Sequence, residues 1–406
     1  MKVHNMENRF IPAFIFSSAI FVVMSPYLPL LVSDLGYSAT LVGIMLGIYE
    51  GAGIAGPLVF GYWADRKNKY RLLLVISCLI PAVIAFPLAL FVHPLATALF
   101  LAILAFCFKP NTSLLDAATT IQIGAKGNYG KIRLWGSIGF VCTTLILQWT
   151  PFFKPENAVH IAFWLMVLSA AAIVPILMLP LTFRGTSNRE TSNEKQTEKL
   201  SIDISLKDTS LEAAKKPKII TLYCITGFML ICLSRFSMVG VYTFFPLYLS
   251  KVIQWNAVGL MFGLSASSEI PFFFHSRALI RRFGSLSLLA LAATAVCVRL
   301  LIYAFFPLKP FIVIAQLLHS LSFGIYYPAA IDFISRVFPP EKRGFGMSLF
   351  LALGQGTPVL IANMAGGAIV ERAGYQSLFI MYAAVSAAAV LVYGVLRKKI
   401  SLTTYE

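Results

Sequence analysis

The chain has 406 residues, of which 58% are hydrophobic and only 12% are charged, and its mean hydropathy is +0.79. A soluble domain carries roughly a quarter charged residues, so this composition excludes a water-soluble globular protein and places the chain in a lipid bilayer. The net charge of +16 could suggest a nucleic-acid partner, but the distribution of the basic residues indicates membrane topology instead.

Long apolar runs recur along the whole chain. A helix needs about 20 residues to cross the ~30 Å hydrocarbon core of a bilayer, and the runs have about this length. The sequence therefore predicts an all-α integral membrane protein with about twelve transmembrane helices. The predicted spans are 10–32, 39–61, 71–92, 95–118, 134–150, 159–181, 219–249, 256–275, 286–305, 310–335, 345–368 and 375–396.

One polar segment, 182–218, interrupts the apolar pattern near the middle of the chain. It is rich in charged residues and poor in aromatic ones, and such a composition cannot bury a core, so it indicates a linker between two parts. We therefore predict an N-terminal six-helix bundle over 1–181, a cytoplasmic linker over 182–218, and a C-terminal six-helix bundle over 219–406.

The second predicted helix of each half begins with nearly the same letters. Residues 42–47 read VGIMLG and residues 258–263 read VGLMFG, and each stretch follows a segment rich in Pro and Leu. Glycines four residues apart lie on one face of a helix and allow another helix to approach closely. The repeat, the even division and the linker together predict two pseudo-symmetric halves, which is the arrangement of major facilitator transporters.

Basic residues are concentrated in alternate loops. An excess of Lys and Arg is typical of loops that remain in the cytoplasm. We therefore expect a multi-pass protein of the cell's inner (cytoplasmic) membrane with both termini in the cytoplasm. The loops assigned to the cytoplasmic side carry Lys2, Arg9, Arg66, Lys67, Lys69, Arg71, Lys126, Lys131, Arg133, Arg277, Arg281, Arg282, Arg336, Lys342, Arg343, Arg397, Lys398 and Lys399, whereas the opposite loops carry only Lys154, Lys251, Lys309 and Arg372.

The loop after the second predicted helix, FGYWADRKNKYR at 60–71, contains a further motif. It resembles the signature loop of the major facilitator superfamily, to which Gly61, Asp65 and Arg66 correspond. Asn68 replaces the family's second glycine, and Asn still tolerates a left-handed backbone. The resemblance implies a gating loop in which Asp65 is the anionic member of a charge latch between helices.

Several ionisable residues fall inside the predicted spans. A charged side chain at mid-bilayer costs ~2.5–3.5 kcal/mol on insertion scales, so such residues usually face a cavity and are functional. Glu50 and Glu269 lie near the midplane by helical rise, and an isolated carboxyl there is neutral unless it is paired. A carboxyl that alternates between these states suits proton coupling, although a structural protonated acid is the simpler alternative.

Basic residues also occur in the spans. Lys109 and Asp116 are seven residues apart and so share a helix face, where they could form a structural pair. Arg235 lies toward the outer side of the seventh span and could extend its guanidinium to the interface. Lys109, Arg235 and the other arginines of the spans would give a central cavity cationic character.

The segment YGKIRLWGSIGF at 129–140 resembles the phenylpropionate permease and oligosaccharide–proton symporter (lactose permease-like) group. In that group an Arg at the start of the fifth helix pairs with an acid late in the fourth helix, and an aromatic ring seven residues after the Arg stacks on the solute. The resemblance assigns these roles to Arg133, Asp116 and Phe140.

The second half extends the resemblance. VRLLIY at 298–303 places Arg299 at the ninth-helix Arg of the group, and His319 falls on the tenth-helix His. Glu269 resembles the eighth-helix acid that links solute and proton sites. Ser322 stands where the group has its main proton-carrying Glu, so coupling could reside in Glu269 or Glu50, or be absent and leave a uniporter.

These observations predict a secondary active transporter, not an enzyme, that moves a small organic solute by alternating access, with proton symport. The solute would be an aromatic acid, a sugar or a nucleoside. We expect no cofactor beyond a proton gradient, no nucleic-acid partner and a monomer in the bilayer. Drug/proton antiport is the alternative within transport, and a channel or a membrane-embedded enzyme the alternative outside it. The sequence lacks the H-E-x-x-H and G-x-S-x-G motifs of common hydrolases.

Overall fold

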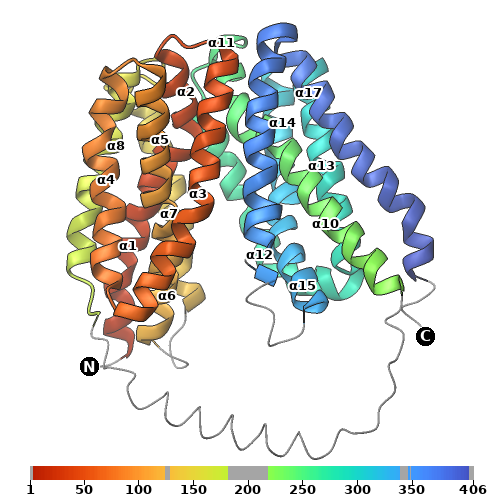
Figure 1. Ribbon diagram of the computed structural model, residues 1–406, viewed down its shortest axis with the longest axis horizontal. Helices are drawn as coiled ribbons and strands as arrows, with labels where there is room; N and C mark the ends of the chain where they lie inside the picture. The colour runs from red at the N-terminus through yellow and green to blue at the C-terminus, as the bar shows by residue number, and fades with distance from the viewer. Residues whose placement is uncertain (1–2, 124–128, 182–217, 339–345, 348, 402–406) are drawn as a thin grey trace, which may run out of the picture.

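The computed structural model describes residues 3–123, 129–181, 218–338, 346–347 and 349–401. Nearly all of these residues are helical (Figure 1). The predicted linker 182–218 lies outside the described residues except for its last residue, Lys218, which begins a helix.

The first bundle occupies the left of Figure 1. Its first crossing is interrupted by a π-helical segment, η1, and its fourth crossing is divided at Lys109. Its helices are α1 (Val3–Val22), η1 (Val23–Tyr27), α2 (Leu28–Asp34), α3 (Ala39–Lys67), α4 (Tyr70–Leu90), α5 (Pro94–Phe108), α6 (Pro110–Ile123), α7 (Tyr129–Trp149) and α8 (Ala158–Leu177).

The second bundle occupies the right of Figure 1. Its elements are α10 (Lys218–Val239), η3 (Gly240–Phe244), α11 (Phe245–Lys251), α12 (Val258–Phe283), α13 (Ser285–Phe305), α14 (Lys309–Leu317), η4 (Ser320–Gly324), α15 (Tyr326–Val337), η6 (Phe350–Gly356) and α17 (Thr357–Ser401).

The predicted twelve crossings are confirmed. In the described ranges ten helices are long and apolar enough to span a membrane. α12 is also long enough, with 26 residues, but is more polar because it carries Glu269. α17 has 45 residues and contains Gly374 at φ 78°, which no helix interior adopts, so it comprises two crossings.

The two bundles repeat the same local irregularity. η1 and η3 are both five-residue π-helices, and each is followed by a helix of seven residues, α2 and α11. Both short helices have a proline at the start, Pro29 and Pro246. Proline has no N–H for the i−4 carbonyl, so the turn before it widens. The predicted pseudo-symmetry is therefore visible even in the defects of the first helix of each half.

The repeated V-G-x-M-x-G glycines lie where the bundles meet. α3 packs against α17 and α7 against α12 (Figure 1). A Cβ on Gly43 of α3 would lie 2.8 Å from the Cα of Gly367, and one on Gly259 of α12 would lie 2.6 Å from the carbonyl oxygen of Thr144. Side chains at these positions would force the bundles apart, so the repeat preserves two equivalent close crossings.

Hydrogen bonds join the bundles beside these crossings. Glu371 Oε2 of α17 accepts from the backbone N–H of Thr40, in the first turn of α3, at 2.7 Å. Gln148 of α7 donates from Nε2 to the carbonyl of Asn256 at 2.8 Å and accepts at Oε1 from the N–H of Leu260, in the first turn of α12, at 3.3 Å. Each bundle therefore caps a free helix N-terminus of the other.

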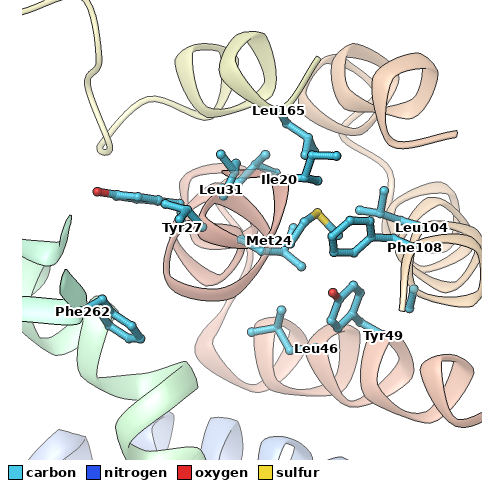
Figure 2. Packing of buried hydrophobic residues seen from close by; sticks show 14 of the residues in the cluster. Ile20, Met24, Tyr27, Leu31, Leu46, Tyr49, Leu104, Phe108, Leu165 and Phe262 are labelled. Atoms are coloured by element: carbon cyan, nitrogen blue, oxygen red, sulfur yellow. The ribbon is translucent and has the colours of Figure 1, made fainter. Parts of the chain in front are cut away.

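We call the end of the molecule where α1 begins and α17 ends the terminal side, and the other end the opposite side (Figure 1). α3 and α12 both begin at the opposite side, so the glycine crossings and the caps lie there. Apart from these contacts, the packing of buried apolar side chains stabilises the bundles. Figure 2 shows Met24 of η1 pointing toward Phe108 of α5, with Tyr49 of α3 close by, and all three belong to one buried cluster.

Candidate solute-binding cavity

A cavity of about 570 Å³ lies between the bundles and is lined by both of them. This is the size of a typical small-molecule site. Its lining extends from Met24 of η1 and Val241 of η3 to Arg133, close to the start of α7. Eight of the residues predicted to bind solute or proton contribute to the lining: Glu50, Lys109, Arg133, Phe140, Arg235, Glu269, Arg299 and His319.

The glycine crossings and the caps lie between this cavity and the opposite side. Neither Gly43 nor Gly259 contributes to the lining, whereas Arg133, near the terminal end of α7, does. The bundles are therefore joined on the opposite side of the cavity, and the cavity extends toward the terminal side.

Three ionisable side chains of the second bundle contact one another in series. Arg299 of α13 is fully buried, and its Nη1 lies 2.7 Å from Nδ1 of His319, at the start of η4. The opposite ring nitrogen, Nε2, lies 2.6 Å from Glu269 Oε1 of α12. The predicted proton-coupling residues Glu269, His319 and Arg299 are therefore in direct contact.

The contacts fix the tautomer of His319. A guanidinium can only donate, so Nδ1 of His319 must accept from Arg299. A neutral imidazole that accepts at one nitrogen carries its proton on the other, so Nε2–H donates to the Glu269 carboxylate. In this tautomer the imidazole is neutral and connects the buried Arg299 cation to the partly buried Glu269 carboxylate by hydrogen bonds.

Neutral polar groups bind both terminal nitrogens of Arg299, whereas its buried Nε has no acceptor among the described residues. Its Nη1 also donates to Ser322 Oγ at 2.9 Å, and its Nη2 donates to Gln316 Oε1 at 3.0 Å and to Tyr303 OH at 3.3 Å. Ser322, which replaces the expected acid, is therefore a ligand of Arg299. Gln316 and Tyr303 were not predicted. The spacing of Tyr303, four residues after Arg299 on one helix, could have indicated it.

Arg235 of α10 is close to this series of contacts but is paired differently. Its guanidinium lies over the ring of Tyr242, 5.2 Å from the centroid, and Tyr242 OH is 3.4 Å from His319 Nε2. The buried Nε and Nη1 of Arg235 have no hydrogen-bond acceptor in the described part of the chain. Arg235 thus stays inside the protein and does not extend to the interface, the alternative the sequence allowed.

The first bundle contributes an ion pair of its own. Lys109, at the break between α5 and α6, pairs through Nζ with Glu50 of α3, and about a quarter of each side chain is exposed. The Lys109 ammonium also lies 4.9 Å from the ring centroid of Tyr49. Gly53, one turn after Glu50, leaves room for the Lys109 stem. Lys109 therefore pairs across helices instead of with Asp116 on its own face.

Arg133 and Asp116 are brought together as the resemblance implied. Arg133 Nε lies 3.7 Å from Asp116 Oδ1, and both side chains are partly exposed. Arg133 lines the cavity, whereas Asp116 does not and is set behind Arg133. The ring of Phe140, seven residues after Arg133, lies in the cavity wall 6.0 Å from that of Phe21. Asp116 thus lies beside Arg133 and does not line the cavity.

The loop after α3 is the remaining predicted element. Asn68 ends α3 at φ 51°, ψ 31°, which is the left-handed conformation expected of it. Asp65 accepts a hydrogen bond from the hydroxyl of Tyr70, and Arg66 donates to Tyr62 OH. A Cβ on Gly61 would meet open space. No ion pair of Asp65 is present within the described ranges, so the charge latch stays a prediction.

The chain is similar to known permeases. It is 28% identical over 279 residues to the maltose permease of Geobacillus stearothermophilus, covering 67% of this chain and 64% of that protein. It is 24% identical over 373 residues to the probable 3-phenylpropionic acid transporter of Escherichia coli (strain K12), covering 91% of each chain.

The fold is that of solved transporters. The crystal structure of the nucleoside transporter NupG superposes with a TM-score of 0.77 at 16% identity, covering 98% of this chain and 100% of that chain. At this identity the superposition shows the fold alone. The MFS_1 like family matches residues 11–381, and the chain is therefore a member of this family of major facilitator transporters.

Proposed function

We propose that the protein is a proton-coupled symporter of a small organic solute in the inner (cytoplasmic) membrane, where it works as a monomer with both termini in the cytoplasm. The solute binds in the cavity between the bundles, and the bundles rock to expose the cavity alternately to the two sides. The terminal side is then the cytoplasmic side, so the structure corresponds to an inward-facing state.

The contact chain from Arg299 through His319 to Glu269 is the observation that carries proton coupling. Arg299 is fully buried and His319 is 5% exposed, so the charge of Arg299 must be offset nearby. Glu269 supplies the offset only while it is ionised. Protonation of Glu269 therefore changes the balance of charge in a cavity that the solute shares.

The positions of the glycine crossings and the helix caps support alternating access. Two glycine crossings and two caps hold the bundles together on the opposite side of the cavity. Their equivalence follows from the repeat, so both can open in one rocking motion. Binding of solute cannot by itself drive accumulation, and the proton gradient supplies the energy.

Uniport is a second candidate, and Ser322 favours it. In the related symporters the position of Ser322 bears the main proton-carrying acid, and here its hydroxyl binds Arg299 at 2.9 Å. A chain that has replaced this acid could transport without protons. Coupling through Glu269 is favoured over uniport because Glu269 is in contact with His319 and lines the cavity.

The test is uptake into proteoliposomes of 3-phenylpropionate, maltose and uridine, with and without an imposed pH gradient. We expect the gradient to drive accumulation of one of these probes by the wild type. Glu269→Gln should retain exchange of labelled for unlabelled solute but lose gradient-driven accumulation. Glu156→Gln, on an exposed loop, is the matched control. Equal accumulation by wild type and Glu269→Gln would contradict coupling through Glu269.

A further inference from the structure

The charges around the cavity do not balance. Four cationic side chains face it, namely Lys109, Arg133, Arg235 and Arg299. Carboxylates offset three of them: Glu50 contacts Lys109, Asp116 lies beside Arg133, and Glu269 reaches Arg299 through neutral His319. Within the described residues no carboxylate lies within 4 Å of Arg235, so one positive charge is left over.

The leftover charge lies inside the protein. Nε and Nη1 of Arg235 are inaccessible to solvent and have no acceptor among the described residues. The Arg235 side chain is only partly buried and has Tyr242 as a partner, but these two buried N–H groups remain unsatisfied, which costs free energy. Hydrogen bonds from a guanidinium to an anion are among the strongest in proteins. A membrane-embedded Arg in this condition is explained if one state of the transport cycle brings an anion to it.

The surroundings of Arg235 specify the rest of the ligand. Tyr242 holds the guanidinium plane from one side by a cation–π contact. Apolar rings of both bundles, among them Phe21, Phe140 and Phe262, form much of the remaining lining. A guanidinium beside apolar walls suits a carboxylate attached to a hydrophobic body.

We infer that the solute is an organic anion whose carboxylate binds Arg235, and that protonation of Glu269 strengthens this binding. The inference rests on the proposed function and names its substrate class. When Glu269 accepts a proton, the carboxylate becomes a neutral acid and Arg299 loses the charge that offsets it. Two arginines without an offsetting carboxylate then face the cavity and attract the anion, so proton and solute each strengthen the binding of the other.

The groups around Glu269 make its charge important for binding an anion. His319 and Arg299 lie on the side of η4 and α13, while Arg235 and Tyr242 lie on the side of α10 and η3. Arg133 of α7 lines the same cavity from the first bundle. Arg299, Arg235 and Arg133 are cationic, Tyr242 is neutral, and His319 is held neutral by Arg299. Glu269 is the carboxylate in this group, so a proton that binds here removes its charge.

The test measures binding to the purified protein in detergent and needs no gradient. The probes are 3-phenylpropionate and its neutral isostere 3-phenylpropionamide, measured by calorimetry at about pH 7, where the acid is ionised. We expect the acid to bind at least tenfold more tightly than the amide.

Substitutions at Arg235 and Glu269 separate the roles of the two residues. Arg235→Gln should weaken binding of the acid by about tenfold or more, as expected for loss of a charge-assisted hydrogen bond, and Arg235→Lys should restore part of it. Glu269→Gln, which removes the carboxylate charge, should bind the acid more tightly than the wild type does. Arg372→Gln, an exposed arginine on the opposite side, is the matched control and should bind as wild type does.

The outcomes distinguish this inference from the proposed function. Equal affinity for acid and amide, an unchanged affinity in Arg235→Gln, or no binding of the acid by any form would overturn the inference. Accumulation of maltose or uridine in the gradient would then leave symport intact with a neutral solute. Conversely, the expected binding pattern without gradient-driven accumulation would support the anion site and contradict symport.

Discussion

The two bundles share a scaffold but differ in where they keep their charges. In both, a π-helical segment precedes a short helix that begins with proline, and a pair of glycines forms the crossing to the other bundle. In the first bundle the Lys109–Glu50 and Arg133–Asp116 pairs are partly exposed. In the second bundle Arg299 and His319 are almost completely buried.

This difference separates the features that pack the two bundles together from the ionisable side chains that line the cavity. Duplication preserves what both halves need, which is a second helix able to pack closely against the other bundle. The ionisable residues do not follow this symmetry. A partly exposed ion pair contributes little to stability, whereas a buried charge is costly unless a counter-charge and hydrogen bonds compensate it. The second bundle is therefore where a change of protonation has the largest consequence.

The largest difference between the two bundles is expected when the cation of each network is removed. Arg299→Met should destabilise the protein by about 3–5 kcal/mol, because it leaves the buried partners of Arg299 and the partly buried carboxylate of Glu269 uncompensated. Lys109→Met, in the partly exposed pair, should cost about 0–1 kcal/mol. Unfolding of both variants in detergent, followed by intrinsic fluorescence, measures the difference. Equal losses would mean that the two networks are equally buried.

The glycine crossings should be next in effect. Gly43→Ala places a Cβ against the backbone of Gly367, and overpacking of this kind costs about 1–3 kcal/mol. The cost falls on the closed opposite side, so the variant should populate states open there. Distances between spin labels at the ends of α3 and α17 report this shift.

Gly61→Ala is the control for this prediction, because a Cβ there meets nothing within 4 Å. It should leave the label distances unchanged. Identical distances in Gly43→Ala and the wild type would show that the crossing tolerates a side chain and that the repeated motif has another cause.

The caps should produce the smallest shift. Gln148→Ala removes two hydrogen bonds across the bundles, Glu371→Ala removes those from Thr40 and Ser38, and each bond contributes about 1 kcal/mol. Both variants should therefore favour opening on the opposite side. Accessibility of a cysteine introduced at Ser265 in the cavity, probed from that side, measures opening. No gain in accessibility in the double variant would exclude the caps as part of the closure.

Much of the fold was predictable because hydropathy and the repeat both depend on local sequence. The twelve crossings, the two halves and the left-handed Asn68 follow from composition, period and backbone preference. The π-helical segments did not, because a proline in a membrane helix indicates a kink without specifying its form. The division of α5 from α6 at Lys109 was missed for the same reason.

The candidate site was predictable where charge made residues conspicuous. Ionisable residues in apolar spans are rare, and seven of those predicted to bind solute or proton line the cavity, together with Phe140. Gln316, Tyr303 and Tyr242 are neutral and carry little cost in a membrane, so they are inconspicuous in the sequence, and only Tyr303 has a spacing from Arg299 that could have indicated it. Pairing was also hidden, because the partner of Lys109 lies on another helix, 59 residues away in sequence.

The proposed placement of coupling in the second bundle is tested most directly by counting protons moved per solute. Proteoliposomes containing a pH-sensitive dye and labelled 3-phenylpropionate report both fluxes at once. Glu50→Gln should slow transport but keep the wild-type ratio of protons to solute, whereas Glu269→Gln should reduce that ratio to zero while exchange continues. An unchanged ratio in Glu269→Gln, or its loss in Glu50→Gln, would contradict the account.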